Sequence, residues 1–172
     1  MAVDVIFLGV VIGPNEVTGD IDSDLLFGFG TQDGPAPIVL MNEPLAADAD
    51  GDGDIDVLAT SKNDDRVIWY ENDGSQNFTA QTVSTATDAP WGLYAIDLDG
   101  DSDIDVLSTS LIDNKVSWFE NDGSQNFAEH TIGSGTSPEG VHAADLDGDG
   151  DVDVLAAFSG SNQVIWYEND GS

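Results

Sequence analysis

The sequence contains no cysteine and very few basic residues. Its 172 residues include two histidines and three cationic residues, Lys62, Arg66 and Lys115. Without cysteine the chain forms neither disulfides nor thiolate metal sites. Because binding to phosphates requires Lys and Arg, nucleic acid and anionic membrane surfaces are poor partners for this chain. The apolar run VIFLGVVIG (5–13) is too short to span a bilayer, so we expect a buried strand and no membrane insertion.

Acidic residues are correspondingly abundant. The chain has 34 Asp and Glu and a formal net charge of -31 at pH 7. Its hydrophobic content of 40% and its four Trp are nevertheless typical of a chain that folds around a core, not of a disordered acidic tail. Multivalent cations are therefore the partners that this composition favours.

Two motifs recur in fixed phase along the chain. The first is AADADGDGDIDVL (46–58), AIDLDGDSDIDVL (95–107) and AADLDGDGDVDVL (143–155). The second is VIWYENDGSQNF (67–78), VSWFENDGSQNF (116–127) and VIWYENDGS (164–172). Successive first aspartates, Asp48, Asp97 and Asp145, are 49 and 48 residues apart. A period of this length is typical of repeat architectures such as propellers.

Each unit is predicted to form four short strands. In the second copy they are residues 92–97, 104–110, 115–121 and 126–132, and an Asp-Gly step between the last two predicts a hairpin turn. No segment has a convincing helical period. The prediction is an all-β protein of β-propeller blades with four antiparallel strands each, about three and a half blades in this chain. A linear array of small calcium modules is the weaker alternative, because the Trp-bearing strands need a stacked neighbour.

The repeat also predicts the boundaries of the units. Residues 1–43 fit it poorly and are interpreted as a degenerate or partial blade with an apolar N-terminal strand, in which TGDID (18–22) is the trace of a lost metal loop. The remaining units are two blades with a calcium loop and an incomplete blade with a calcium loop: 44–91, 92–139 and 140–172.

The Asp-rich segments match the opening of an EF-hand-type calcium loop. Carboxylates at positions 1, 3 and 5 alternate before a turn residue at position 6, a backbone oxygen follows at position 7, and a further Asp at position 9 begins a strand. Calcium prefers six to eight oxygen ligands, whereas magnesium demands a stricter octahedron and zinc or copper would require His or Cys. We expect about three Ca²⁺ sites. Their residues are Asp48, Asp50, Asp52, Asp54, Asp56, Asp97, Asp99, Asp101, Asp103, Asp105, Asp145, Asp147, Asp149, Asp151 and Asp153.

Electrostatic repulsion supports a bound cation. These loops hold 15 of the 34 acidic residues. Two carboxylates 4 Å apart repel by roughly 4 kcal/mol at an effective dielectric constant of 20. A divalent cation replaces that repulsion with attraction.

With these motifs, residues 44–172 resemble the FG-GAP, or VCBS-type, calcium-binding β-propeller repeat family of integrin α-like blades. The resemblance implies that the aspartates at positions 1, 3, 5 and 9 are side-chain ligands, and that Asp54, Asp103 and Asp151 contribute backbone oxygens. It also implies an extracellular or cell-surface adhesion or recognition module. One residue departs from the pattern: Ser102 replaces the glycine at position 6 of the second loop.

The sequence also bears on two other functional classes. An enzyme is disfavoured, because the aspartates are assigned to metal loops and His130 and His142 stand singly without a partner. A calcium-dependent lectin is the better alternative. Trp91 has no aromatic counterpart in the next repeat, where Glu139 stands. It is interpreted either as a packing residue shielded from solvent or as a platform for a glycan or another surface ligand. The recurring Trp69, Trp118 and Trp166 are expected in the core or between blades.

The chain ends predict self-association. The last unit stops after its third strand and turn, which leaves a strand edge open to pairing. We expect residues 1–13 of one subunit to add to the incomplete last blade of another, giving a closed ring or a filament. The main alternative is that this chain was cut from a longer repeat protein.

Overall fold

The described part of the chain consists of strands and turns. The computed structural model describes residues 26–27, 39–75 and 77–171, and within them every regular element is a β-strand. This part of the chain contains no helix long and apolar enough to cross a membrane. The all-β prediction is confirmed.

The strands form three antiparallel sheets, each in chain order, which we call blades 1, 2 and 3. Blade 1 contains β1 (Leu26–Phe27), β2 (Val39–Ala47), β3 (Asp56–Ser61), β4 (Arg66–Asn72) and β5 (Phe78–Ser84). Blade 2 contains β6 (Pro90–Ile96), β7 (Asp105–Ser110), β8 (Lys115–Asn121) and β9 (Phe127–Ser134). Blade 3 contains β10 (Pro138–Ala144), β11 (Asp153–Phe158) and β12 (Gln163–Tyr167).

The hairpin between β8 and β9 shows how turn chemistry sets these strands. Gly123 has a φ of 73°, a left-handed conformation that glycine adopts without strain. The Asp122 carboxylate accepts hydrogen bonds from the backbone N–H groups of Ser124 at 2.9 Å and Asn126 at 3.3 Å. The side chain therefore closes the turn that the Asp-Gly step predicted, and blade 1 repeats the arrangement at Asp73.

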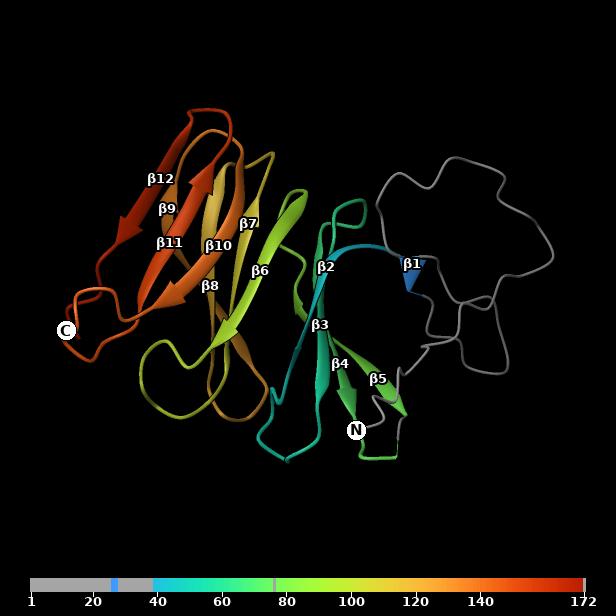
Figure 1. Ribbon diagram of the computed structural model, residues 1–172. Coiled ribbons are helices and arrows are strands. Elements are labelled where there is room, and N and C mark those ends of the chain that lie inside the picture. Colours follow the sequence, from blue (N-terminus) through green and yellow to red (C-terminus); the bar gives the residue numbers. More distant parts are fainter. Residues whose placement is uncertain (1–25, 28–38, 76, 172) are drawn as a thin grey trace, which may run out of the picture.

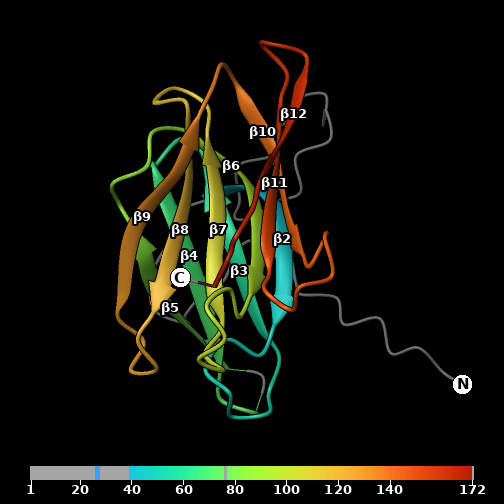
Figure 2. The same ribbon diagram turned by 90° about the vertical axis from the view of Figure 1, so that its left-hand side faces the viewer.

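The blades pack face to face, with blade 2 in the middle (Figure 1). Strands β2, β6 and β10 occupy equivalent places in the repeat, and β6 packs against both β2 and β10. Blade 1 contributes Leu58 and Trp69 to the cluster shared with blade 2, which contributes Val106 and Phe119. A second cluster joins blade 2 to blade 3 through residues such as Val116 and Val154. Blade 3 is the sheet that faces the viewer in Figure 2.

The strand bounds agree closely with those expected from the sequence. Strand β8 covers the expected residues 115–121, while β6 begins at Pro90, two residues early, and β9 extends to Ser134. Strand β2 begins at Val39, so blade 1 starts before the predicted boundary at residue 44. The segments 1–13 and 18–22 lie outside the described residues.

Candidate metal centre

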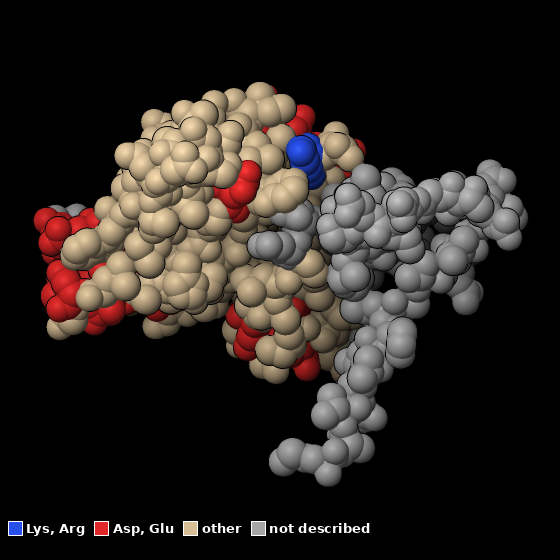
Figure 3. Space-filling view, turned by 45° about the horizontal axis from the view of Figure 1, so that its top comes forward, with Lys and Arg blue, Asp and Glu red and all other residues tan. Residues whose placement is uncertain are grey.

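The three Asp-rich loops occupy equivalent places in the three blades. Loop 1 (48–56) joins β2 to β3, loop 2 (97–105) joins β6 to β7, and loop 3 (145–153) joins β10 to β11. All three lie at the lower side of the stack in Figure 1. Acidic side chains gather at the lower left and the bottom of Figure 3, on the same side. The sequence repeat is therefore also a spatial repeat along one edge of the molecule.

The aspartate at position 1 organises each loop. In loop 1, the two carboxylate oxygens of Asp48 accept hydrogen bonds from the backbone N–H groups of Gly51 at 2.9 Å and Gly53 at 3.1 Å. Asp97 and Asp145 make the same pair of bonds in loops 2 and 3. These bonds fold the loop around the carboxylate, so that the following side chains are brought close together.

Position 6 has a left-handed backbone in every loop. The φ angles are 96° at Gly53, 81° at Ser102 and 104° at Gly150. A Cβ added at Gly53 or Gly150 would meet no neighbouring atom within 4 Å. Serine at position 6 of loop 2 therefore has a conformational cost from its left-handed φ, whereas the equivalent positions of loops 1 and 3 have room for a Cβ.

The aspartate at position 9 is fully buried and anchors the loop to the sheet. Asp56, Asp105 and Asp153 each have 0% exposure. In loop 1, the carboxylate of Asp56 accepts hydrogen bonds from the N–H of Ala49 at 3.0 Å and the N–H of Asn72 at 2.8 Å. The same two bonds recur in the other loops. Position 9 thus ties its loop to the end of the third strand.

The aspartate at position 7 faces the hairpin of the second motif. A Cβ added at Gly74 would overlap the carboxylate of Asp54, and the same holds for Gly123 with Asp103 and for Gly171 with Asp151. The side chain at position 7 is therefore packed against the Asn-Asp-Gly turn. This arrangement leaves the backbone oxygen as the group that position 7 can offer to an ion, as the family resemblance implies.

The asparagine of the second motif links neighbouring loops, a role that the sequence did not reveal. The Asn121 amide donates to the carbonyl of Ile104 in its own blade at 3.2 Å and to the carbonyl of Ala49 in loop 1 at 3.5 Å. Asn169 makes the same two bonds, to Val152 and to Leu98 in loop 2. In the sequence, the only sign of this role is an asparagine that recurs at the end of the WYEN or WFEN strand.

Carboxylate oxygens converge in all three loops. The groups whose ligand atoms lie within 4.8 Å of one another are Asp48, Asp50 and Asp56; Asp97, Asp99 and Asp101; and Asp145, Asp147 and Asp153. Positions 1 and 3 belong to every group, joined by position 9 in loops 1 and 3 and by position 5 in loop 2. Asp52, Asp105 and Asp149, also predicted as side-chain ligands, are not in these groups. Three hard oxygen donors, together with a backbone carbonyl, form a donor set that fits calcium.

Crowded negative charge shifts the pKa of the position 3 carboxyls. Burial raises the pKa of Asp50 and Asp99 above the ordinary value, and the neighbouring loop carboxylates add to the effect. The pKa of Asp147 is also raised. There the N–H of Asp149 lowers it, but burial and the charges of Asp149 and Asp153 outweigh that bond. The loops therefore hold their negative charge at a cost that a cation would remove.

Comparison with protein families agrees with this architecture. The model of the FG-GAP-like repeat matches residues 48–108 and 97–156, two overlapping stretches that each run from one Asp-rich loop into the next. The chain belongs to the FG-GAP-like repeat family. No curated protein matches the chain significantly. The three FG-GAP-type blades are thus defined by their sequence, their sheets and their family.

The other singled-out residues lie away from the loops. Trp91 is half-buried, its carbonyl accepts a hydrogen bond from the Thr60 hydroxyl at 3.1 Å, and the Lys62 ammonium lies 5.0 Å from its ring centroid. One approach to the ring is therefore already occupied by a cation.

The two histidines differ from each other. His142 is an exposed strand residue, as expected, and packs edge-on against Tyr94 with ring centroids 4.4 Å apart. The expectation that His130 has no partner was wrong, because its Nε2 lies 2.7 Å from the Glu120 carboxylate and its ring lies 4.7 Å from Trp118. The two partners are on adjacent antiparallel strands, β8 and β9, a pairing that the sequence alone did not align.

Proposed function

We propose that this protein is a calcium-stabilised, non-enzymatic repeat scaffold of the extracellular space or cell surface, acting in adhesion or structure. The convergence of carboxylate oxygens within 4.8 Å in every one of the three loops carries the proposal. Calcium would bind to the position 1 and position 3 aspartates, with position 5 or 9 and a position 7 backbone oxygen completing the protein's contribution. The extracellular location is argued from the family alone.

The ion would act by structure, not by chemistry. Three strands recur in every blade (β2–β4, β6–β8 and β10–β12). Each loop joins the first two of them and is tied to the end of the third through position 9. A cation that neutralises the loop therefore stabilises three strands at once. A carboxylate held by calcium is a poor acid or base, so we assign no catalytic role to these residues.

Thermal unfolding with calcium and with chelator tests the proposal. For sites of 10⁻⁴–10⁻³ M affinity, calcium at 100 times the dissociation constant should add about 2.7 kcal/mol per site. Magnesium at the same concentration is the control for ionic strength and should stabilise much less. A variant with Asp48→Asn and Asp50→Asn should lose one of the three binding events in calorimetric titration. An unchanged melting temperature in calcium would refute the proposal.

We also propose the self-association through the chain termini that the sequence predicts. Strand β12 is paired only with β11 within the described residues, which leaves its other side available for strand addition. Deletion of residues 1–13 should then abolish assembly seen by light scattering in calcium. Assembly that persists after the deletion would contradict this route.

A further inference from the structure

The residue at position 2 of loops 1 and 2 is buried against the following blade. Ala49 is 3% exposed and Leu98 is 8% exposed, although the turns that follow them, residues 51–53 and 99–102, are exposed. Both side chains belong to the apolar clusters that join their blade to the next. Each lies between the aspartates at positions 1 and 3, whose carboxylates converge. A shift of position 2 therefore moves both of these carboxylates, because the three residues share one backbone.

Within its own loop, position 2 is held by position 9. The N–H of Ala49 donates to the Asp56 carboxylate at 3.0 Å. In loop 2, the N–H of Leu98 donates to the Asp105 carboxylate at 3.1 Å. The other oxygen of that carboxylate accepts a hydrogen bond from the N–H of Asn121 at 2.8 Å. Position 9 thus joins position 2 to the asparagine at the end of the third recurring strand.

The carbonyl group of position 2 accepts a hydrogen bond from the following blade. The Asn121 amide donates to the carbonyl of Ala49 at 3.5 Å, and the Asn169 amide donates to that of Leu98 at 3.4 Å. Both distances are near the upper limit of a hydrogen bond, so a movement of a fraction of an ångström at position 2 strengthens or breaks them. The asparagines themselves are fixed, since the amide oxygen of Asn121 accepts a bond from the N–H of Gly123 at 3.2 Å and Asn169 is held in the same way.

These bonds form one chain from loop 1 to loop 3. It runs from position 9 of loop 1 through position 2 to Asn121, then through Asp105 and Leu98 to Asn169, and ends at Asp153, position 9 of loop 3, at 2.8 Å. The carboxylates in the chain are charged acceptors, which make the stronger kind of hydrogen bond. Whatever fixes one loop therefore restricts position 2 of the preceding loop.

The charges of the loops act in a different sense. Each loop carries five aspartates, so it keeps a net negative charge even with a divalent cation bound. That cation weakens the negative potential at the neighbouring loop and so lowers its attraction for a second cation. Salt screens the effect over about 8 Å at physiological ionic strength. Electrostatics alone therefore predicts loops that bind independently or weaken each other.

We propose that neighbouring loops bind calcium with positive coupling, transmitted by Asn121 between loops 1 and 2 and by Asn169 between loops 2 and 3. The inference rests on the proposed function, since it requires that the loops bind calcium. When loop 2 is occupied, Leu98 and Asp105 are fixed, and Asn121 with them. Loop 1 then has less conformational freedom to lose when it binds its own ion. By thermodynamic linkage, loop 1 has the same effect on loop 2. The stack would respond to calcium over a narrower concentration range than three independent sites.

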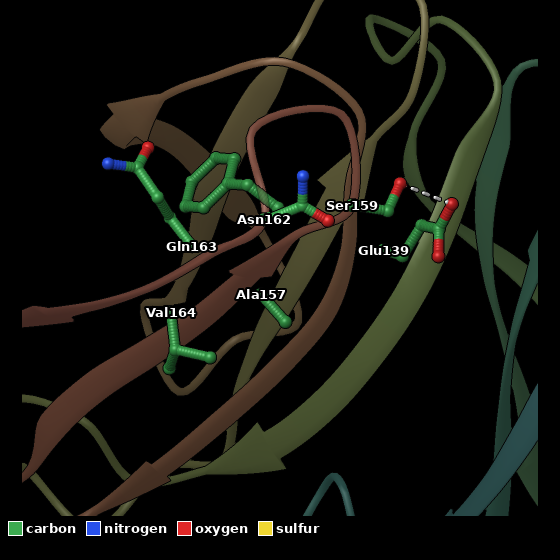
Figure 4. A pocket seen from close by; sticks show the side chains of 7 residues that line it. Glu139, Ala157, Ser159, Asn162, Gln163 and Val164 are labelled. Carbon is green, nitrogen blue, oxygen red and sulfur yellow. Dashed lines mark hydrogen bonds between the residues drawn. The ribbon is translucent and has the colours of Figure 1, made fainter.

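Other contacts hold the blades together at the strand ends away from the loops. The hydroxyl of Thr60 donates to the Trp91 carbonyl of blade 2 at 3.1 Å, and the hydroxyl of Thr109 donates to the Glu139 carbonyl of blade 3 at 3.4 Å. Figure 4 shows the surroundings of Glu139, whose carboxylate accepts a hydrogen bond from the Ser159 hydroxyl of its own blade at 2.7 Å. Loss of an asparagine amide should therefore uncouple two loops and leave the blades stacked.

Calcium titrations followed by NMR test the coupling loop by loop, with the amide signal of Gly53 as the reporter of loop 1. A variant with Asp97→Asn and Asp99→Asn disables loop 2. Five carboxylates with a divalent ion and three carboxylates without one carry the same net charge, so this variant leaves the electrostatic influence on loop 1 matched. We expect calcium binding at loop 1 to weaken about tenfold, within the usual range of coupling between two sites.

Replacement of the asparagines locates the coupling. In an Asn121→Ala background, the loop 2 variant should change the calcium affinity of loop 1 by less than about twofold. Asn169→Ala is the matched control, because it removes the equivalent amide between loops 2 and 3 and should keep the coupling between loops 1 and 2. The dispersion of the amide spectrum verifies folding. If Asn121→Ala does not fold, Asn121→Ser takes its place, since the shorter side chain would not reach the Ala49 carbonyl.

Each outcome decides the matter. A weakening at loop 1 that Asn121→Ala abolishes and Asn169→Ala preserves supports the coupling. An unchanged or tighter loop 1 overturns it and leaves the calcium-stabilised scaffold standing. A weakening that is undiminished in the Asn121→Ala background assigns the coupling to another contact and overturns this route. Loop amides that do not respond to calcium in the unaltered protein refute the proposed function, and the coupling with it.

Discussion

Blades 2 and 3 have nearly the same sequence motifs but different surroundings. Asp105 and Asp153 occupy the same position, are both 0% exposed, and accept the same two backbone hydrogen bonds. Burial raises the pKa of Asp105, whereas the N–H groups of Asn169 and Leu146 lower the pKa of Asp153. Blade 2 is covered on both faces and blade 3 on one, so desolvation is greater in blade 2. The same residue thus has a different energetic role in each repeat.

The largest expected difference is between the effects of an aspartate substitution at Val116 and at Val164 on the free energy of unfolding. Val116→Asp would bury an unpaired charge between two blades, and we expect a loss of about 3–5 kcal/mol in the free energy of unfolding. Val164→Asp should change the free energy of unfolding by no more than about 0.5 kcal/mol. Urea unfolding at low protein concentration measures both values. Similar losses in the two variants would mean that the outer face of blade 3 is covered even in the single chain.

Asparagine provides a second comparison, between an end blade and the middle one. Asn121→Ala removes an amide that donates to the carbonyls of two loops, whereas the amide of Asn72 donates to one carbonyl, that of Ile55. We expect losses of about 1–3 kcal/mol for Asn121→Ala and about 1 kcal/mol for Asn72→Ala. Calorimetric titration of Asn121→Ala should also show weaker calcium binding at loop 1, which contains no substitution. Unaltered binding at loop 1 would contradict the link.

A smaller effect should distinguish loop 2 from its neighbours. Ser102→Gly removes a left-handed non-glycine residue and should stabilise the protein by up to about 1 kcal/mol while tightening calcium binding at loop 2. Gly150→Ser is the reciprocal change in loop 3 and should weaken that site by a similar amount. Equal affinities in Ser102→Gly and the unchanged protein would show that serine is not strained at this turn.

The smallest effect is the pH dependence of the metal-free protein. A carboxyl whose folded pKa is raised, such as Asp105, destabilises the fold when ionised, so this penalty disappears as the pH falls through its folded pKa to the ordinary value of 3.8. The effect of Asp153 on stability has the opposite sign. Its ionised carboxylate stabilises the fold at pH values above the ordinary pKa of 3.8, and that contribution is lost as the pH falls through its lowered folded pKa. Carboxyl chemical shifts followed by NMR in chelator should titrate Asp105 above 3.8 and Asp153 below it. The reverse order would contradict the difference in burial.

Much of this architecture could be predicted from the sequence, because its signals are local. The Asp-Gly step and the alternation of VSWFEN predicted the hairpin and the bounds of β8. The alternating aspartates of the loops likewise predicted convergent carboxylates at positions 1 and 3. The start of β6 at Pro90 was predicted two residues too late, because the pairing of Pro90 with Ser110 on the neighbouring strand determines where the strand begins.

The unpredicted features all arise between segments far apart in the chain. The exposure of Trp166 depends on whether another sheet lies against blade 3. The sequence of the repeat does not indicate whether such a sheet is present. The bond from Asn121 to Ala49 spans 72 residues. The pairing of His130 with Glu120 depends on the register of two strands, and no turn length alone specified it.

The contact between position 7 and the hairpin glycine has an evolutionary consequence. Because the carboxylate of Asp54 occupies the space that a side chain at Gly74 would need, the Asp-rich motif and the Asn-Asp-Gly motif constrain each other in every repeat. Neither can diverge freely while the other is maintained, so the two should be inherited and lost as a pair. Residues 1–43, which lack an intact Asp-rich motif, also lack any WYENDG-like sequence.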